Sequence, residues 1–471
     1  MEHASQPSHA RGRRLCNVRL PGCGDSSQAS DQRWRLSLDA HGRITALEPI
    51  PPGSSAAGDD WGGDWLSPMG VDLQINGGLG LAFPELTPAD QPRLVQLLER
   101  LWADGVEAIS PTLVTCGVTP LRQALAVLRE VRAEHRPGRC RLLGAHLEGP
   151  FLAPERRGAH PAEHLAAPSL AALEQRIGGF LGPAELVEPG AGRPRATALG
   201  APPHDSPDQP GEESWPQESS DFAGDGTPAP SEADAHQRQD HEQGRSPAWP
   251  AGVLQADLAL VTLAPELPGA LEVIAELRRR GVVVSLGHSA ASEAQAEAGF
   301  AAGVSMLTHV LNAMPDMHRR APGPAAAALL RGDVHLGLIA DGVHVAPTMA
   351  VLLQRLAPER VVIVSDALAP YGLADGIHRW DERELHVSGG SCRLADGTLA
   401  GVTLPLLEGA VRLAAWSGRP DQAIAAATVL PRRVLGEMRP IEKLLLGRSL
   451  NACLRWRQEP EGLRWSRAAE A

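Results

Sequence analysis

The sequence has no apolar segment long enough to cross a membrane. Its longest apolar runs, such as VVIVSDALA after Arg360, reach about half of the roughly 20 residues that a spanning helix needs. The first residues, MEHASQPSHARGRRLC, include basic side chains but no following apolar stretch, so they do not match a secretory signal. We therefore expect a cytoplasmic protein with no membrane segment.

Cysteines are few, and no two of them form a C-x-x-C pair. Such scattered thiols argue against a disulfide framework and against a zinc site made of thiolates. We expect all six to be reduced and structural: Cys16, Cys23, Cys116, Cys140, Cys392 and Cys453.

The chain also lacks an excess of basic charge. It has 44 Lys and Arg against 56 Asp and Glu, which gives a formal net charge of −12. This balance disfavours the phosphate backbone of a nucleic acid as a partner. Any anionic substrate must therefore be bound by donors placed locally around it.

What the sequence does contain is a succession of short apolar runs rich in β-branched residues. Most are separated by segments of helical length and periodicity, which are clearest at 89–104, 120–135 and 270–280. Apolar strands that alternate with amphipathic helices are typical of a parallel sheet covered by helices, and eight units predict closure into a (β/α)8 barrel of the TIM type. The eight runs are 65–73, 106–113, 141–147, 258–263, 282–286, 305–309, 335–340 and 361–365.

Further short strands are predicted near both chain ends, and we expect them to pair as one small appended β-sandwich. Turn residues occur at 39–42, 389–390 and 396–397. The expected domains are the N-terminal part of the sandwich at 12–64, the catalytic barrel at 65–380, and C-terminal strands and helices at 381–460 that complete the sandwich and the packing of the barrel. The added strands are 14–20, 34–47, 385–399 and 452–456.

The alternation of predicted strands and helices is interrupted once, at about 186–251. This segment is rich in Pro, Gly, Ser, Asp, Glu and Gln and has few aliphatic residues. Such a segment cannot bury enough apolar surface to offset its ordering entropy, so it predicts a disordered insertion in a surface loop. We interpret its histidines, His204, His236 and His241, as ordinary residues of that loop rather than metal ligands.

Ionisable side chains occur where four of the predicted strands end. In barrels of this kind the chemistry lies at the carboxyl ends of the strands. Glu148, His288 and His309 offer the imidazole and carboxylate ligands that a zinc-like ion prefers, with one position left for water. Each of them alone reads as a satisfied buried polar residue, but three at neighbouring strand ends predict a metal site.

Asp366 follows a strand that has no other titratable group. Since it should face the same barrel mouth, we interpret it as a catalytic acid/base rather than as a loop-capping aspartate. His160 and His344 lie in loops that should overhang the mouth, although each taken alone is an ordinary loop histidine.

Local strings around these residues resemble one family closely. The strings are HLEGPFL with GAH downstream, TLAPE, GHS, THVLNAMP, ADGVHV and SDALAP, in this order along the chain. Together they are similar to the N-acetylglucosamine-6-phosphate deacetylases of the amidohydrolase superfamily, and the likeness runs over about 67–436 without the insertion. Six motifs in the correct succession are far more specific than any single one.

The resemblance implies a chemistry for these residues. Glu148, His288 and His309 would hold one divalent ion, expected to be Zn²⁺, which activates a water molecule. Asp366 would take a proton from that water and deliver it to the departing amine. His160 would polarise the acetyl carbonyl and stabilise the oxyanion. The expected reaction gives glucosamine 6-phosphate and acetate, in amino-sugar catabolism.

The resemblance also implies substrate contacts. Asn312, the backbone of Ala313 and Gly149 match positions near the sugar phosphate, and His344 matches one that contacts the sugar. Arg320 matches an arginine lent by the neighbouring subunit of a homodimer, and a guanidinium suits a phosphate monoester. The alternative for Arg320 is a solvated surface charge.

The residues on the first barrel strand differ between branches of the superfamily. Many amidohydrolases have His-x-His there for a second metal, but this chain has Gln74 and Asn76, which are poor zinc ligands and predict a single ion. The insertion, Met69-Gly70 and the segment 447–451 depart from the family pattern without touching a proposed ligand. Two other functions stay open: hydrolysis of another N-acetyl amino sugar or a cyclic amide, and a catalytically silent sugar-phosphate sensor.

Overall fold

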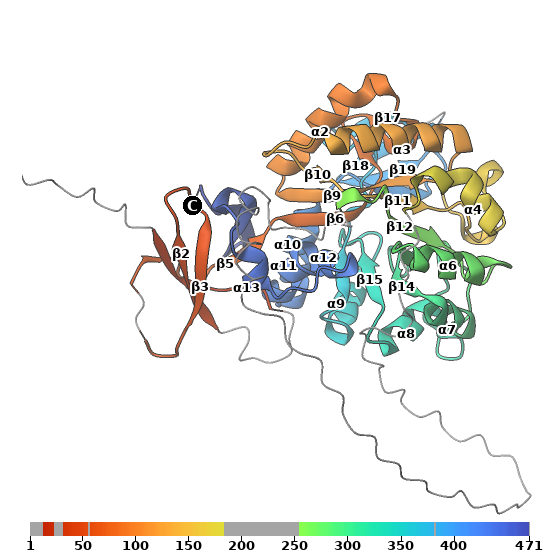
Figure 1. The fold of residues 1–471 in the computed structure, drawn as a ribbon. Coiled ribbons are helices and arrows are strands. Elements are labelled where there is room, and N and C mark those ends of the chain that lie inside the picture. The colour runs from red at the N-terminus through yellow and green to blue at the C-terminus, as the bar shows by residue number, and fades with distance from the viewer. Residues whose placement is uncertain (1–12, 23–31, 55–56, 183–253, 381–382, 471) are drawn as a thin grey trace, which may run out of the picture. The chain divides into compact units, whose positions relative to one another are not determined.

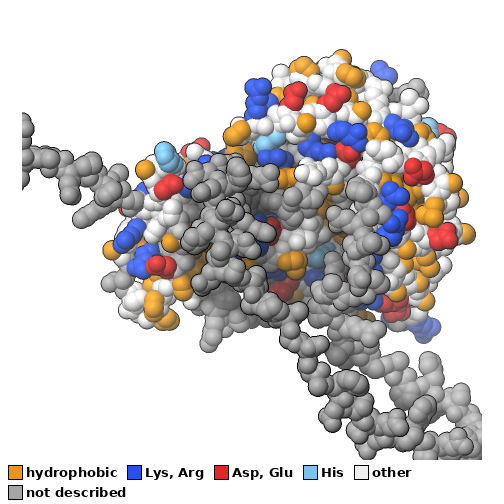
Figure 2. Space-filling model, in the orientation of Figure 1, with side chains coloured by type: hydrophobic (Ala, Val, Ile, Leu, Met, Phe, Trp, Pro, Cys, Tyr) orange, Lys and Arg blue, Asp and Glu red, His pale blue; other side chains and the backbone are white. Residues whose placement is uncertain are grey.

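A computed structural model describes residues 13–22, 32–54, 57–182, 254–380 and 383–470. The insertion predicted at 186–251, with its three histidines, lies outside these residues. Within the described part, no helix combines the length and apolar character needed to span a bilayer. On the face shown in Figure 2, Lys and Arg side chains are interspersed with Asp and Glu over the described surface.

A parallel barrel sheet forms the centre of the fold. Its strands are β6 (Gly70–Ile75), β9 (Val106–Val114), β10 (Arg141–Leu142), β11 (Ala145–Glu148), β12 (Leu258–Leu263), β13 (Val283–Leu286), β14 (Val304–Leu307), β15 (His335–Leu338) and β16 (Val361–Ile363). They are hydrogen bonded in the order β10-β9-β11-β12-β13-β14-β15-β16, and β6 pairs with β9. A parallel bridge between Ile75 and Ala367 joins the two remaining edges. This confirms the predicted (β/α)8 barrel.

Helices lie outside the barrel strands, as Figure 1 shows for α2, α3, α6, α7, α8 and α9. In α2 the buried residues recur every three or four positions and form one stripe, which consists of Leu94, Leu97, Leu98 and Leu101. The helices are α2 (Gln91–Ala103), α3 (Val118–Ala133), α4 (Leu170–Ile177), α6 (Ala270–Arg279), α7 (Glu293–Ala302), α8 (Gly323–Leu330), α9 (Pro347–Leu356), α10 (Leu406–Ser417), α11 (Pro420–Thr428), α12 (Leu430–Val434) and α13 (Ile441–Leu445).

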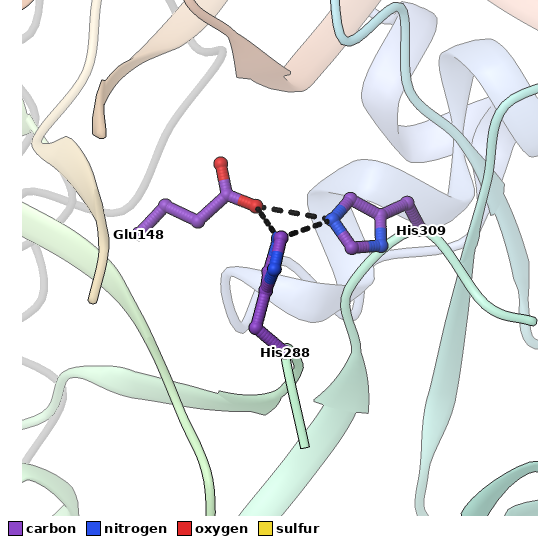
Figure 3. Close-up of side chains that lie close together, drawn as sticks. All are labelled: Glu148, His288 and His309. Atoms are coloured by element: carbon purple, nitrogen blue, oxygen red, sulfur yellow. Dashed lines mark hydrogen bonds and ion pairs between the residues drawn. The ribbon is translucent and has the colours of Figure 1, made fainter. Parts of the chain in front are cut away.

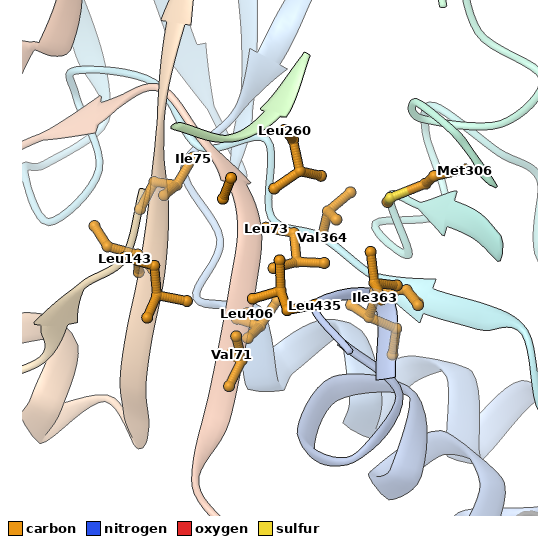
Figure 4. Packing of buried hydrophobic residues seen from close by; sticks show 14 of the residues in the cluster. Val71, Leu73, Ile75, Leu143, Leu260, Met306, Ile363, Val364, Leu406 and Leu435 are labelled. Carbon is orange, nitrogen blue, oxygen red and sulfur yellow. The ribbon is translucent and has the colours of Figure 1, made fainter. Parts of the chain in front are cut away.

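The largest hydrophobic core fills the barrel and the space between its strands and helices. Every residue of β6 is buried, as expected for a strand with helices or side chains on both faces. Figure 4 shows Val71 and Leu73 of this strand packed in the same cluster as Ile363 of β16 and Leu406 of α10. The core therefore holds the first and last strands of the barrel side by side.

Both chain ends contribute to a separate β structure, as predicted. One sheet has the order β3-β2-β1-β4 and another the order β22-β21-β5. Residues of both sheets, including Leu15, Ile44, Leu66 and Cys453, share one buried cluster. The strands are β1 (Arg14–Val18), β2 (Arg33–Leu38), β3 (Ile44–Ile50), β4 (Asp59–Asp60), β5 (Trp65–Pro68), β21 (Cys453–Glu459) and β22 (Gly462–Arg467).

The run expected to be the first barrel strand, 65–73, is divided between two sheets. Its first part, β5, pairs antiparallel with β21. Its second part, β6, pairs parallel with β9. The prediction of one continuous strand was therefore wrong, because an apolar run does not show where the chain changes its pairing partner.

A separate antiparallel sheet corrects the expectation that 385–399 joins the sandwich. It consists of β17 (Gly376–Trp380), β18 (Arg383–Ser388), β19 (Ser391–Leu394) and β20 (Leu399–Val402), in that order. A bridge from Ala367 to Val402 ties it to the barrel. Its apolar side packs on Leu368, just after β16, with Val114 at the end of β9. The sheet thus lies at the carboxyl ends of the barrel strands.

Candidate metal and catalytic site

A cavity of about 510 Å³ opens at the carboxyl ends of the barrel strands. Glu148 is the last residue of β11, His288 and His309 each follow a strand by two positions, and Asp366 comes three positions after β16. These four side chains and His160 all line the cavity. The strand-end residues noted in the sequence are thus brought to one place by the closed sheet.

Three of these side chains meet at one point, as Figure 3 shows. Oε1 of Glu148 is 3.2 Å from Nε2 of His288 and 3.1 Å from Nε2 of His309. The two imidazole nitrogens are 3.0 Å apart. All three side chains are buried, and in the described part of the chain they form the one group of His, Cys, Asp or Glu with the spacing of a metal site.

The donor set fits a divalent ion. Around a triangle with edges of 3.0 to 3.2 Å there is a point about 2 Å from every corner, which is the bond length zinc makes to nitrogen and oxygen. Nδ1 of His288 lies 3.0 Å from the carbonyl oxygen of Arg156. When Nδ1 donates its proton there, Nε2 presents a lone pair to the other two ligands. The cluster can therefore bind a metal ion.

The electrostatics of Glu148 suit the same role. Burial opposes ionisation, but the close side-chain contacts with His288 and His309 hold the pKa of Glu148 well below its ordinary value. The carboxylate is thus charged at neutral pH, which a metal ligand requires.

The backbone is strained at these residues. His288 has a φ of 46°, His309 of 27° and Asp366 of 51°, in the left-handed region that side chains other than glycine avoid. Each such residue costs on the order of 1–3 kcal/mol, and such strain clusters at functional sites. Because each one lies two or three positions after the end of a strand, the turn in the chain directs its side chain into the cavity at the barrel mouth.

Asp366 lies beside the cluster and is held by two amides. Its Oδ1 accepts hydrogen bonds from Nδ2 of Asn76 at 2.8 Å and from Nε2 of Gln74 at 3.2 Å. The same Gln74 nitrogen is 3.3 Å from Oε1 of Glu148. Burial, and then the charge of Glu148, raise the pKa of Asp366 to about 6. The carboxyl can therefore exchange a proton near neutral pH.

His160 reaches the cluster from the loop after β11. The backbone N–H of Thr115 donates to its Nδ1 at 3.3 Å, while its Nε2 lies 4.0 Å from Oε1 of Glu148. Burial, and then the neighbouring His288, lower the pKa of His160 to about 3. The ring is thus neutral, and since Nδ1 accepts a hydrogen bond, the proton is on the Nε2 that faces the cluster.

Comparison with known proteins identifies the family. The chain is 30% identical to the N-acetylgalactosamine-6-phosphate deacetylase of Escherichia coli O157:H7, with 84% of each chain covered. It is also 30% identical to the human N-acetylglucosamine-6-phosphate deacetylase, over 80% of this chain and 76% of that protein. The chain belongs to the N-acetylglucosamine-6-phosphate deacetylase family. No protein-family model matches it.

Solved structures of this deacetylase family have the same fold. The N-acetyl-D-glucosamine-6-phosphate deacetylase of Mycobacterium smegmatis has a TM-score of 0.66 and 25% identity, with 97% of this chain and 98% of that chain covered. An aspartate-to-alanine variant of the M. smegmatis enzyme, in complex with N-acetyl-D-glucosamine-6-phosphate, has a TM-score of 0.63 and 26% identity, with 90% of each chain covered.

The structure places three of the residues expected to contact a deacetylase substrate in the cavity wall: Asn312, Ala313 and His344. Nδ1 of His344 is 2.7 Å from Oδ2 of Asp341, which orients the imidazole. The side-chain Nδ2 of Asn312 donates to the backbone carbonyl of His309 at 3.2 Å, so this side chain is fixed next to a residue of the metal-ligand cluster.

Gly149 and Arg320, which were also expected near the substrate, do not line the cavity. Gly149 has a φ of 93°, and a Cβ there would come within 2.1 Å of Oγ1 of Thr115. Its position therefore requires glycine for packing. Arg320 lies in an exposed segment between β14 and α8.

Several residues of the cavity wall were not predicted from the sequence, among them Thr115, Trp380 and Arg383. Thr115 comes directly after β9, so the strand-end rule that selected Glu148 could have found it. Trp380 and Arg383 come from the β17–β20 sheet. Trp380 ends the range that was expected for the barrel, and Arg383 precedes the strand 385–399 that was expected in the appended sandwich. No signal in the sequence placed that sheet at the barrel mouth.

Proposed function

We propose that this chain hydrolyses the acetamide bond of N-acetyl-D-glucosamine 6-phosphate to give glucosamine 6-phosphate and acetate, as a cytoplasmic enzyme of amino-sugar catabolism. The proposal rests on the convergence of Glu148, His288 and His309 beside Asp366 in one cavity. Family membership supports the same reaction. A sensor would have no need of a buried carboxyl whose pKa lies near neutrality.

One zinc ion is the proposed cofactor. Glu148, His288 and His309 would hold it, and when bound it would supply a Lewis acid and lower the pKa of a water ligand. Gln74 and Asn76 occupy the strand-one positions where a second metal would need ligands, and both donate amide N–H groups to carboxylates. Because amide nitrogens are not metal ligands in this geometry, a single ion per chain is expected.

Asp366 would act as the general base and then as the general acid. The carboxylate takes a proton from the water whose oxygen adds to the acetyl carbonyl carbon. It then gives that proton to the sugar nitrogen as the carbon–nitrogen bond breaks, so that acetate and a free amine leave. The hydrogen bonds from Asn76 and Gln74 hold Oδ1 in place for both transfers.

His160 would stabilise the developing oxyanion. Its neutral ring presents an N–H toward the cluster, because Nδ1 is taken by the Thr115 amide. A preorganised donor in a buried site stabilises negative charge on the carbonyl oxygen without reorganising at the moment of reaction. The low pKa of the ring keeps it from competing with the metal as a second cation.

Substrate contacts are proposed for the remaining wall of the cavity. Asn312, the backbone of Ala313 and His344 would bind the sugar phosphate, with Gly149 shaping the turn behind Glu148. Arg320 would reach the phosphate in the neighbouring site of a homodimer. Its exposure on a segment outside the cavity of its own chain is what that role requires.

A second candidate substrate is N-acetyl-D-galactosamine 6-phosphate, which differs at one hydroxyl. The relative from E. coli O157:H7 that covers 84% of this chain is named for that sugar. The residues proposed for the chemistry act on the acetamide and would serve either epimer. The two sugars must therefore be compared directly.

The testing experiment measures acetate release and metal content on one preparation. Zinc-loaded protein is assayed with each of the two sugar phosphates and with unphosphorylated N-acetylglucosamine. We expect about one zinc per chain and a higher kcat/KM for the phosphorylated sugars. Arg320→Ala should raise KM for the two sugar phosphates but not for unphosphorylated N-acetylglucosamine. If neither sugar phosphate releases acetate, the proposed function is contradicted.

A further inference from the structure

The loop that carries His160 is held by contacts from several parts of the barrel mouth. The carbonyl of Arg156 lies 3.0 Å from Nδ1 of His288, and the amide of Ala153 donates to the carbonyl of His288 at 2.8 Å. Thr115 contacts the imidazole itself, as described above. The position of His160 is thus fixed by contacts outside its own loop.

Arg383 supplies one more of these contacts, from the antiparallel sheet. It begins β18 and lines the cavity. Its Nη1 donates to the carbonyl oxygen of Ala159 at 2.8 Å. Its guanidinium carbon lies 4.4 Å from the ring centroid of Trp380. The side chain therefore connects the β17–β20 sheet with the loop of the proposed catalytic histidine.

The bond to Ala159 acts directly on His160. The accepting carbonyl belongs to the peptide group that contains the backbone nitrogen of His160, so its direction sets the orientation of that residue. A charged donor makes a stronger bond than a neutral one, and the flat guanidinium stacked on an indole has little freedom to turn. Together these features fix the plane of the Ala159–His160 peptide.

We propose that Arg383 is a positioning residue that keeps Nε2 of His160 directed at the metal-ligand cluster. The proposal rests on the proposed deacetylation. Arg157 also contacts the loop, by donating to the carbonyl of His160 at 2.8 Å, but it is part of the same loop. Arg383 instead ties the loop to a separate sheet that reaches the barrel mouth, so the two parts of the cavity wall would move as one.

The first test compares three variants. Arg383→Gln removes the charge and the stacking, and Arg383→Lys keeps a charged donor. Arg393→Gln is the matched control, because Arg393 also donates to a carbonyl in this sheet, that of Gly397 at 3.0 Å, but is exposed and does not line the cavity. Steady-state kinetics, zinc content and thermal unfolding are measured for each.

We expect Arg383→Gln to lower kcat roughly 10- to 100-fold, the range seen when partners that orient site residues are removed. KM and zinc content should stay near the wild-type values, and Arg383→Lys should recover part of the loss. The control variant should match the wild type. A loss that appears in KM alone would overturn the proposal, because it would make Arg383 a direct substrate ligand.

The second test is a double-mutant cycle with His160→Ala, using enzyme in excess so that slow turnover can be measured. If Arg383 acts through His160, Arg383→Gln should change the rate less than about twofold once the imidazole is absent. An equal loss in both backgrounds would show that the two residues act independently and would overturn the proposal.

A measurement without substrate separates this inference from the proposed function. Hydrogen exchange of the 154–161 loop and of the Thr115 amide should be faster in Arg383→Gln than in Arg393→Gln, with other segments unchanged. Unchanged exchange would overturn the positioning role even if the enzyme is active. If the wild-type protein releases no acetate but exchange is still faster in Arg383→Gln than in Arg393→Gln, only the proposed function is contradicted.

Discussion

Nε2 of His288 lies 3.0 Å from Nε2 of His309 in a buried site. Two neutral imidazole nitrogens cannot both present lone pairs at this separation unless a proton or a cation lies between them. Nδ1 of His288 is placed to donate to the carbonyl of Arg156, which leaves its Nε2 as an acceptor. With Glu148 equally close to both rings, the arrangement favours a cation.

Removal of the metal should therefore destabilise the protein. A ligand that binds only the folded state raises stability with its concentration, by about 2.7 kcal/mol at a hundred times its dissociation constant. We expect chelated protein to unfold at a lower temperature and added zinc to restore the midpoint. Scanning calorimetry with metal analysis measures both.

His309→Ala provides the comparison for that experiment. This variant lacks one of the three ligands, so zinc should no longer shift its midpoint. A full zinc-dependent shift in His309→Ala would place the ion elsewhere.

Asp366→Asn should stop turnover without loss of the metal. The amide has nearly the same shape but cannot accept a proton, and general acid–base catalysis typically contributes about 10²- to 10⁴-fold. We expect kcat to fall at least that far, since one residue serves both proton transfers in the proposed mechanism, while zinc content stays at the wild-type level. Normal turnover in this variant would remove Asp366 from the mechanism.

Activity should fall on the acid side of pH 6. Burial and Glu148 raise the pKa of Asp366 to about 6. The general base must be deprotonated, so kcat/KM should decrease as the pH drops through this value. A bound cation stabilises the carboxylate and would place the acid limb of the pH–rate profile at or below pH 6. The pH–rate profile measures it, and a limb above pH 7 would contradict this assignment.

Asn76→Ala should move the same limb to higher pH. Nδ2 of Asn76 donates to Oδ1 of Asp366 at 2.8 Å, and a hydrogen bond to the charged form lowers a pKa. Its loss should raise the pKa of Asp366 and shift the acid limb upward. A profile that matches the wild type would mean that Asn76 does not hold the ionised carboxylate.

The strands and the strand-end residues could be predicted because both follow from local pattern. Fully apolar runs give parallel strands, and a polar residue such as Glu148 at the end of such a run reaches the barrel mouth. The roles of His160 and His344 needed the family resemblance. Their loops have no period from which an orientation could be inferred.

What could not be predicted is decided by packing between distant elements. The apolar side of the β17–β20 sheet would fit either the sandwich or the barrel, and its contact with Leu368 decides between them. Arg383 enters the cavity only as a result of that choice. The division of 65–73 into two strands also depends on pairing partners, β21 and β9, that lie far away in the sequence.

Glu107 forms a buried ion triad that should be essential for stability. It lies on β9 with Oε1 2.5 Å from Nη2 of Arg432 and Oε2 2.7 Å from Nη1 of Arg448. These arginines come from α12 and from the segment before β21, so the triad joins the barrel to the C-terminal part of the chain. Glu107→Gln would remove the carboxylate that both buried guanidinium groups contact, and the loss of one partner from a buried ion pair typically costs about 3–5 kcal/mol.

The pH dependence of this loss has a definite sign. Burial opposes ionisation, but Arg432 and Arg448 hold the pKa of Glu107 below its ordinary value. The stabilisation is therefore present above the unfolded-state pKa of roughly 4.3 and is lost as the pH falls through the lower folded-state pKa. In urea unfolding at pH 7, the free energy of unfolding of Glu107→Gln should be lower than that of the wild type by the full amount. This difference should shrink below about pH 4.

Glu48→Gln is the matched control, because Glu48 pairs with Arg35 on the surface, where both side chains are exposed. Solvent screens such a pair, so this variant should unfold close to the wild type at every pH. If Glu107→Gln behaved like Glu48→Gln, the guanidinium groups of Arg432 and Arg448 would have to be hydrated, and the triad would not be a buried link between β9 and the C-terminal segments.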